Sequence, residues 1–202
     1  MLDPLEKEID EIRKNVDFDE LLSLAKAAII FFMKERLYLP VEPKGFYAAT
    51  FVTLTRFGQL RGCIGSLKPY RDIREDVVSN AVGAAFQDPR FPPLGENEFE
   101  GLELEVSVLT DLVPFSGSND DFKKYIDEEK PGVVIERGMF RATFLPDVWH
   151  ELPNVNEFLE HLSMKAGMPP NGWMMSNKYV YKTLIKKKPW HEIDEKPFLK
   201  NL

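Results

Sequence analysis

Hydrophobic residues recur at helical spacing in two stretches at the start of the chain. Asp3 is suited to cap a first helix, in which the apolar residues at positions 5, 9, 12 and 16 share one face. Asp17 and Glu20 form an acidic version of the capping box, and an apolar stripe then extends from Leu21 to Phe32. We therefore predict two helices, and we expect the second to be central to the core.

A hairpin, a helix and a strand are predicted next. Residues 47–55 are rich in β-branched and aromatic side chains, and residues 60–66 return after a glycine-containing turn. Apolar residues at every fourth position from 73 to 85 predict a helix that begins at Pro69 and stops before Asp88 and Pro89. Residues 102–108 alternate between apolar and polar side chains, which is the period of a half-buried strand with Glu103 and Glu105 on its polar face.

The same order of elements is then predicted a second time. Ser118 begins a helix, residues 133–135 and 140–145 form a hairpin, Asn154 begins a helix, and residues 178–185 form a last strand. Chance similarity of two ordinary hairpins is the alternative to a true duplication. We predict an α+β protein built from internally duplicated helix-hairpin-helix-strand units, over residues 18–110 and 118–186, with helices packed on mostly antiparallel sheet. Residues 187–202 are expected to form a C-terminal tail.

Composition limits the classes of protein that the chain can represent. With 202 residues, 44% of them hydrophobic, it can bury a core as one domain or as two packed halves. A single cysteine cannot form an internal disulfide, which favours a reducing, cytoplasmic setting. The formal charge of −7 argues against nucleic-acid binding, and the apolar run 27–33 is too short to cross a membrane. The basic residues 185–188 are interpreted as a solvated tail.

The repeat brings two hairpin sequences into register. When Gly58 is set over Gly138 without gaps, Arg61 falls on Arg141 and Cys63 falls on Thr143. Each matched pair keeps its size class or its charge. A true duplication would relate the two halves by an approximate two-fold axis, and their strands would form one continuous sheet or two sheets facing a cleft.

Several motifs resemble one protein family. The hexapeptide LRGCIG at residues 60–65 is followed by AAFQDPRFPPL, LELEVSVL, GVVIERG, RATFLPDVW and FLEHLSMKAGMP, which together resemble the AMMECR-one domain, named from the Alport syndrome, midface hypoplasia and elliptocytosis chromosomal region. The resemblance extends from about Phe18 to Ile185, and the hexapeptide is its most specific mark. One departure is Ala142, where family members often have glycine, which puts in doubt any role that needs glycine's backbone freedom there.

The resemblance implies further expectations. It implies an α+β fold with internal duplication and a groove between two unequal subdomains. It also implies a family whose biochemical function is not established and whose prokaryotic members often lie beside Memo-type and radical S-adenosylmethionine proteins. A shared modification pathway is therefore expected, while the resemblance assigns neither a reaction nor a cofactor.

Cys63 lies between two glycines and close to an arginine. Strand geometry predicts that Arg61, Cys63 and Gly65 share one face while Leu60 and Gly62 share the other with residue 64. A guanidinium beside a thiol favours the nucleophilic thiolate, and flanking glycines would let a ligand approach the backbone. The competing interpretation, which we favour from sequence, is a small buried cysteine with glycines that allow close packing.

Candidate ligand-binding residues gather around this motif. They are Arg61, Gly62, Cys63, Gly65, Asp88, Arg90, Glu103, Glu105 and Arg141. Paired guanidinium groups suit a carboxylate or a phosphate, whereas a structural network of salt bridges and a helix-stop turn are the alternatives. The three histidines, at positions 150, 161 and 191, have no obvious partners, and no paired His or Cys motif predicts a metal site.

Three functions remain open at this point. The first is a protein that binds a small anionic ligand or a protein segment in a cleft between subdomains. The second is a thiol-dependent enzyme with Cys63 as its nucleophile and Arg61 beside it, and the third is a regulatory adaptor that acts through its surface. Whether the protein is an enzyme, which substrate it takes and how it assembles do not follow from the sequence.

Overall fold

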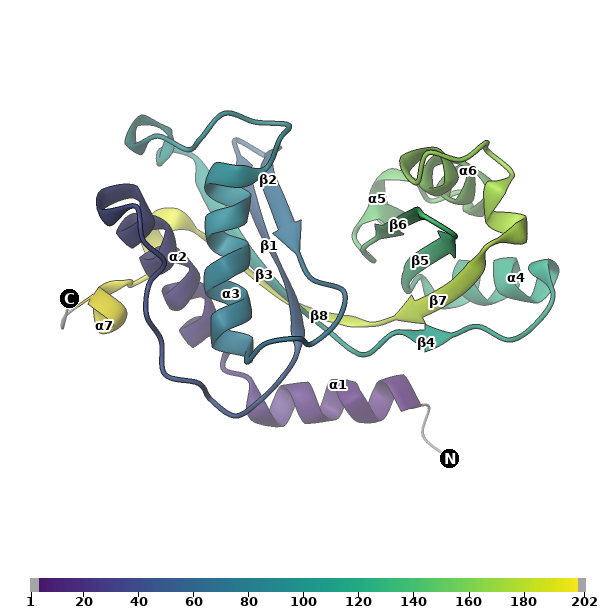
Figure 1. Cartoon of the computed structure of the whole chain (residues 1–202), viewed down its shortest axis with the longest axis horizontal. Helices are drawn as coiled ribbons and strands as arrows, with labels where there is room; N and C mark the ends of the chain where they lie inside the picture. The colour runs from purple at the N-terminus through teal and green to yellow at the C-terminus, as the bar shows by residue number, and fades with distance from the viewer. Residues whose placement is uncertain (1–3, 200–202) are drawn as a thin grey trace. The chain divides into compact units, whose positions relative to one another are not determined.

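The computed structural model describes residues 4–199 and shows a mixed α and β protein (Figure 1). The chain divides into two compact units, and each is described by itself. The first unit consists of Glu6–Asp111 together with the chain from Leu184 on. The second unit consists of Leu112–Thr183 with the first residues of the chain up to Leu5. Each unit contains one four-stranded sheet.

The first sheet has the strand order β2-β1-β3-β8, and the β1–β2 and β1–β3 pairs are antiparallel. Helices α2 and α3 pack against it, and short helical segments follow α3, precede β3 and follow β8. In chain order the elements that accompany this sheet are α1 (Pro4–Asn15), α2 (Phe18–Glu35), β1 (Ala49–Arg56), β2 (Gln59–Gly65), α3 (Ile73–Val82), the π-helix η1 (Gly83–Gln87), the 3-10 helix η2 (Glu96–Glu98), β3 (Leu102–Leu109), β8 (Thr183–Pro189), the 3-10 helix η4 (Trp190–Glu192) and α7 (Lys196–Leu199).

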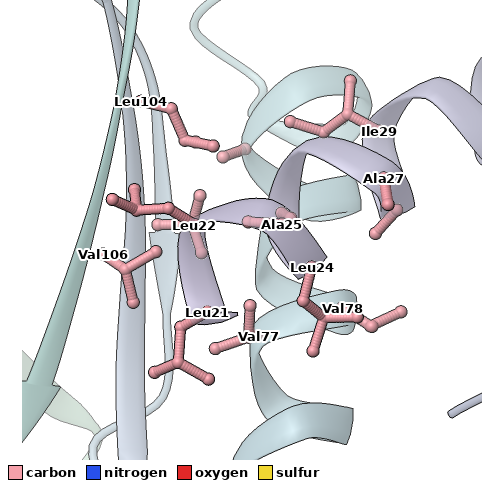
Figure 2. Packing of buried hydrophobic residues seen from close by; sticks show 14 of the residues in the cluster. Leu21, Leu22, Leu24, Ala25, Ala27, Ile29, Val77, Val78, Leu104 and Val106 are labelled. Carbon is pink, nitrogen blue, oxygen red and sulfur yellow. The ribbon is translucent and has the colours of Figure 1, made fainter. Parts of the chain in front are cut away.

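The main core of the first unit lies between its sheet and its two long helices. Leu21 and Leu22 of α2 point toward the sheet, where Leu104 and Val106 of β3 meet them, and Val77 of α3 lies alongside (Figure 2). All five side chains are buried. This face of the sheet is therefore fixed by burial, and its opposite face, with Glu103 and Glu105, remains only half-buried.

The second sheet has the strand order β4-β7-β5-β6 and is antiparallel at each of these pairs. Phe122, Phe158 and Leu162 come from its helices and are fully buried in its core. Its elements are β4 (Val113–Pro114), α4 (Asn119–Glu129), β5 (Gly132–Arg137), β6 (Phe140–Phe144), α5 (Val148–Glu151), α6 (Val155–Lys165), the 3-10 helix η3 (Gly172–Met175) and β7 (Asn177–Tyr181).

The predicted α+β class with antiparallel sheet is confirmed, and so are three helix starts. Asp17, Ser118 and Asn154 each accept hydrogen bonds from backbone N–H groups of the first turn of their helices. Asp3, which we expected to cap the first helix, lies outside the described residues. In both sheets the first hairpin strand pairs with the second hairpin strand on one side and with a later strand on the other, in the orders β2-β1-β3 and β6-β5-β7, whereas β8 and β4 do not correspond. The internal duplication itself stays a prediction.

The helix predicted from Pro69 begins later and ends differently. It begins at Ile73 because the Asp72 carboxylate accepts a hydrogen bond from the backbone N–H of Arg74 and so caps the helix there. After Val82 the backbone continues as the π-helix η1 rather than as regular α-helix. The apolar spacing indicated the helix correctly but could not reveal this widened turn, which often occurs beside functional residues.

The end of the chain differs most from our expectation. The strand predicted over residues 178–185 is two strands, β7 and β8, which belong to different sheets. The segment from 187 on was predicted to be a tail, yet Trp190 and Ile193 lie in the core of the first unit. Lys26 of α2 is buried and holds this segment, because its Nζ donates to the carbonyl oxygens of Trp190 and Ile193 and pairs with Glu195. The predicted solvated tail is therefore wrong.

The basic residues 185–188 also have structural partners. Lys186 and Lys188 of β8 both pair with Asp19, and Lys187 pairs with Glu103.

Within residues 4–199, no helix is both long enough and apolar enough to cross a membrane.

Candidate functional site

The strand that carries Cys63 contains a bulge. In the β1–β2 ladder, Thr55 lies opposite Leu60 and Leu54 lies opposite Gly62, so Arg61 has no partner residue on β1. Leu60 is consequently 43% exposed instead of facing the core with Gly62. Our prediction of uninterrupted alternation, with Arg61 beside Cys63 on one face and Leu60 on the other, is therefore wrong at the two residues before Gly62.

The bulge directs the buried Arg61 side chain into a salt bridge with the half-buried Glu98. Its Nε and Nη2 donate to the two carboxylate oxygens of Glu98 at 2.7 and 2.9 Å, and Nη2 also donates to the carbonyl oxygen of Pro92. The Arg61 side chain is 9% exposed. The guanidinium is the main cause that lowers the pKa of Glu98 from 4.5 to about 2. Arg61 is thus held by the segment before β3 and is not available at the surface.

The two glycines of the hexapeptide have packing roles. A Cβ on Gly62 would lie 2.1 Å from the backbone oxygen of Ala84, because the π-helix η1 approaches β2 directly at this residue. A Cβ on Gly65 would meet the ring of Phe51, which covers that position from the neighbouring strand. Both glycines therefore allow close packing, as in the competing interpretation of the motif.

Cys63 itself is half-buried and lies on the outer face of the first sheet, opposite the face that packs on α2 and α3. Its sulfur accepts a hydrogen bond from Oγ1 of Thr53 at 3.3 Å. Glu105 lies opposite Thr53 on the other side of β1, so Cys63, Thr53 and Glu105 form one row across three strands. Glu103 lies in the next row, opposite Thr55, whose hydroxyl donates to it at 3.0 Å.

Asp88 and Arg90 attach the loop after η1 to the same edge strand. Oδ2 of Asp88 accepts a hydrogen bond from the backbone N–H of Cys63 at 2.9 Å, and Nη2 of Arg90 donates to the carbonyl oxygen of Cys63 at 3.4 Å. Because β2 is at the edge of its sheet, this ion pair occupies backbone groups that a further strand would otherwise bind. Arg90 also donates to Asp88 from Nε and Nη2, and it is the main cause that lowers the pKa of Asp88 well below its ordinary value.

Arg141 is placed differently from Arg61. The β5–β6 ladder is regular, and Arg141 lies opposite Glu136 in the second pair from the turn. In the first hairpin the second pair from the turn is Leu60 with Thr55, so Leu60 and not Arg61 corresponds to Arg141. Arg141 and Arg61 are therefore not equivalent ladder positions, which corrects the gap-free alignment. Arg141 is exposed and its Nε is 3.5 Å from a carboxylate oxygen of Glu136.

The three histidines and the possible metal ligands are separate candidates in the sequence. His150, His161 and His191 are all exposed. Among residues 4–199, no group of three or more His, Cys, Asp or Glu side chains is arranged to hold a metal ion.

Two residues, one in the site and one that holds Arg61, were not selected from the sequence. Thr53 was missed because the bulge changes which residue of β1 lies opposite Cys63, and Glu98 was missed because it lies in a short 3-10 helix of an irregular loop. The DPRF segment that was selected, with Asp88 and Arg90, does reach Cys63. The site within the first unit therefore consists of Cys63 and Thr53 at its centre and the Asp88–Arg90 pair at its edge.

Comparison with known proteins shows the family to which the chain belongs. The family model described as AMMECR1 matches residues 8–185. A protein of Methanosarcina acetivorans is 35% identical over 153 residues, which cover 73% of this chain and 76% of the relative. Protein MK0488 of Methanopyrus kandleri is 34% identical over 176 residues, which cover 80% and 82%. The chain belongs to the AMMECR1 family.

A solved structure has the same fold. The crystal structure of PH0010 from Pyrococcus horikoshii, which is described as an uncharacterized protein, matches with a TM-score of 0.75 and 31% sequence identity. The match covers 85% of this chain and 96% of that one. The family resemblance drawn from the hexapeptide and its companion motifs is thereby confirmed, and so is the fold class.

Proposed function

We propose that the protein binds a small anionic ligand on the outer face of its first sheet, between the thiol of Cys63 and the guanidinium of Arg90. This proposal uses residues of the first unit only. Arg61 acts here as a positioning residue: it fixes the bulge, and the bulge determines which way Cys63 faces. The expected carboxylate or phosphate ligand would meet a half-buried sulfur on one side and a cation on the other.

The exposure of Arg90 carries this proposal. In the Asp88–Arg90 pair, the carboxylate side chain is 2% exposed and the guanidinium side chain is 52% exposed. The Asp88 carboxylate is therefore buried, and it accepts hydrogen bonds from the backbone N–H of Cys63 and from the guanidinium of Arg90. Nη1 of Arg90 has no hydrogen-bond partner among the described residues, so one edge of the guanidinium faces solvent. A planar guanidinium edge of this kind suits carboxylate and phosphate oxygens.

A second candidate function rests on the Thr53 hydroxyl. A hydrogen bond donated to sulfur, together with a nearby guanidinium, favours the thiolate over the thiol. Cys63 would then be the nucleophile of a thiol-dependent enzyme, with Arg90 in the place that we first gave to Arg61. Glu105, in the same row beyond Thr53, is the carboxylate of the outer face that lies nearest in register.

Alkylation tests both functions because Cys63 is the only cysteine of the chain. We compare iodoacetate, which is anionic, with iodoacetamide, which is neutral, in the folded protein and in urea. If Arg90 attracts anions to the thiol, the ratio of the iodoacetate rate to the iodoacetamide rate is about threefold to tenfold higher in the folded protein. Inorganic phosphate should lower this ratio more than chloride does at equal ionic strength.

Two variants distinguish the site from the general surface. Arg90→Gln should return the rate ratio to the value in urea, whereas Arg13→Gln should not, although Arg13 is also an exposed arginine paired with a carboxylate. A ratio that is the same in folded and unfolded protein contradicts anion binding. Faster reaction with iodoacetamide in the folded state that Thr53→Val abolishes supports the thiol enzyme. A thiol protected from both reagents until unfolding contradicts both functions.

A further inference from the structure

The second unit carries an apolar hollow beside the turn of its hairpin. Phe140 of β6 and the segment Gly167–Pro169 after α6 line it, together with the turn residues Arg137 and Gly138, and its volume is about 450 Å³. Phe140 is 43% exposed and Met139 is 90% exposed, so large apolar side chains face solvent around it. Gly167 has a φ of +80°, which glycine adopts readily, and it lets the chain turn directly after α6 next to Phe140.

Basic side chains lie in the hollow and on the elements next to it, in a chain whose net charge is −7. Arg137 is exposed at the turn, and its side chain makes no ion pair or hydrogen bond with any of the described residues. Arg141 is exposed on β6 and has only a 3.5 Å pairing with Glu136. Lys165, at the end of α6, donates from Nζ to the carbonyl oxygen of Thr143. An apolar hollow lined by Arg137, in a hairpin that also carries the exposed Arg141, is complementary to an apolar group that carries carboxylates nearby.

The strand beside the hollow is an edge strand. β6 is the last strand in the order β4-β7-β5-β6, and it lies at the side of its sheet in Figure 1. A two-residue turn makes Arg137 and Phe140 a hydrogen-bonded pair, so the backbone groups that face away from β5 are those of Arg141 and Thr143. The bond from Lys165 to the carbonyl of Thr143 agrees with this direction. The backbone of Arg141 is therefore directed to where a further strand would pair.

We propose that this edge binds an extended segment of another protein in which apolar and acidic residues alternate. The segment pairs with β6, and because side chains alternate along a strand, it presents one set to each face of the sheet. On the face shared by Phe140 and Ala142, an apolar side chain enters the hollow. On the opposite face, acidic side chains meet Arg141. This surface belongs to the second unit and is independent of the function proposed for Cys63.

The test uses a fluorescein-labelled peptide, Ser-Glu-Val-Glu-Phe-Glu-Ser, with the full chain and fluorescence anisotropy. Arg141→Glu should weaken binding about tenfold, whereas Arg13→Glu, at an exposed arginine of α1, should change it less than about twofold. A peptide with lysine in place of each glutamate should bind about tenfold more weakly or not at all. Arg141→Ala removes the charged side chain but keeps the backbone N–H, whereas Arg141→Pro also removes this outward N–H and should weaken binding further.

A modified peptide tests strand pairing without changing the protein. Methylation of the backbone nitrogens on either side of the phenylalanine removes pairing and should abolish binding if the segment adds to β6. Absence of binding by the unmodified peptide at about 1 mM overturns the proposal. It is also overturned if binding survives both methylation and Arg141→Glu, or if decanoate displaces the peptide while methylation has no effect. The last result would make the hollow a site for small amphiphiles.

Discussion

The hairpins β1–β2 and β5–β6 begin alike and then diverge. Both have two-residue turns, with positive φ at Phe57 and Gly58 in the first and at Gly138 in the second. The second ladder continues regularly from Arg137 to Val133. In the first ladder the bulge at Arg61 intervenes, and every later residue of β2 moves by one position relative to β1.

This single extra residue decides which way the thiol faces. Without the bulge, a regular ladder from the same turn would place Cys63 opposite Val52, which is fully buried in the core. With the bulge, Cys63 lies opposite Thr53 on the outer face. Since a shift of one residue exchanges the two faces of a strand, the bulge converts a core position into an accessible one. The difference between the hairpins is thus the bulge, which places the thiol of the first hairpin on the outer face of its sheet.

The first prediction tests how closely the bulged hairpin is packed. Gly62→Ala should destabilise the first unit by about 3 kcal/mol, because the new Cβ would lie 2.1 Å from the backbone oxygen of Ala84 and the backbone cannot easily move. The matched change in the regular hairpin is Ala142→Gly, which should cost about 1 kcal/mol through lost burial and added chain entropy. Hydrogen exchange at α3 and at β5 measures the two units separately. Equal effects of the two changes would contradict the role given to η1.

The sequence predicted those parts that depend on local pattern. The alternation around Glu103 and Glu105 gave the correct faces of β3, and Asp17, Ser118 and Asn154 marked the starts of their helices. These signals are local because one strand face or one helix turn produces them. The apolar stripe from Leu21 on likewise reflects one helix face that is buried.

The bulge and the loop contacts could not be predicted in this way. Pairing between strands is not encoded by the alternation of either strand alone, so the change of register at Arg61 is invisible in LRGCIG. The contact of Asp88 with Cys63 depends on where the π-helix η1 ends, which is directly before Asp88. The change from β7 to β8 was missed for a related reason: one continuous β-rich stretch serves two sheets.

The second prediction compares the two arginines. Arg61→Ala should destabilise the protein by about 2 to 3 kcal/mol, since it removes a buried, bidentate partner and leaves the carboxylate of Glu98 with one backbone donor from Gly95. Arg141→Ala should cost less than about 1 kcal/mol because its pairing is exposed. Urea denaturation measures both. Arg61→Ala should in addition change the alkylation rate of Cys63, whereas Arg141→Ala should leave that rate unchanged. If Arg61→Ala destabilises the protein without changing the alkylation rate, the salt bridge does not hold the bulge in place.

The third prediction is a dependence of stability on pH that the bulged hairpin should show and the regular hairpin should not. The pKa of Glu98 is lowered from 4.5 to about 2 in the folded protein, mainly by its hydrogen bonds with Arg61. A lowered folded-state pKa stabilises the protein fully above about pH 4.5, and this stabilisation is lost as the pH falls toward 2. Glu98→Gln should therefore be less stable than the wild type at pH 7, by an amount that shrinks between pH 4.5 and 2. Glu136→Gln, at the exposed pair of the regular hairpin, is the control and should follow the wild type throughout. A difference between Glu98→Gln and wild type that stays constant down to pH 2 would mean that the salt bridge with Arg61 contributes nothing to the fold of the bulge.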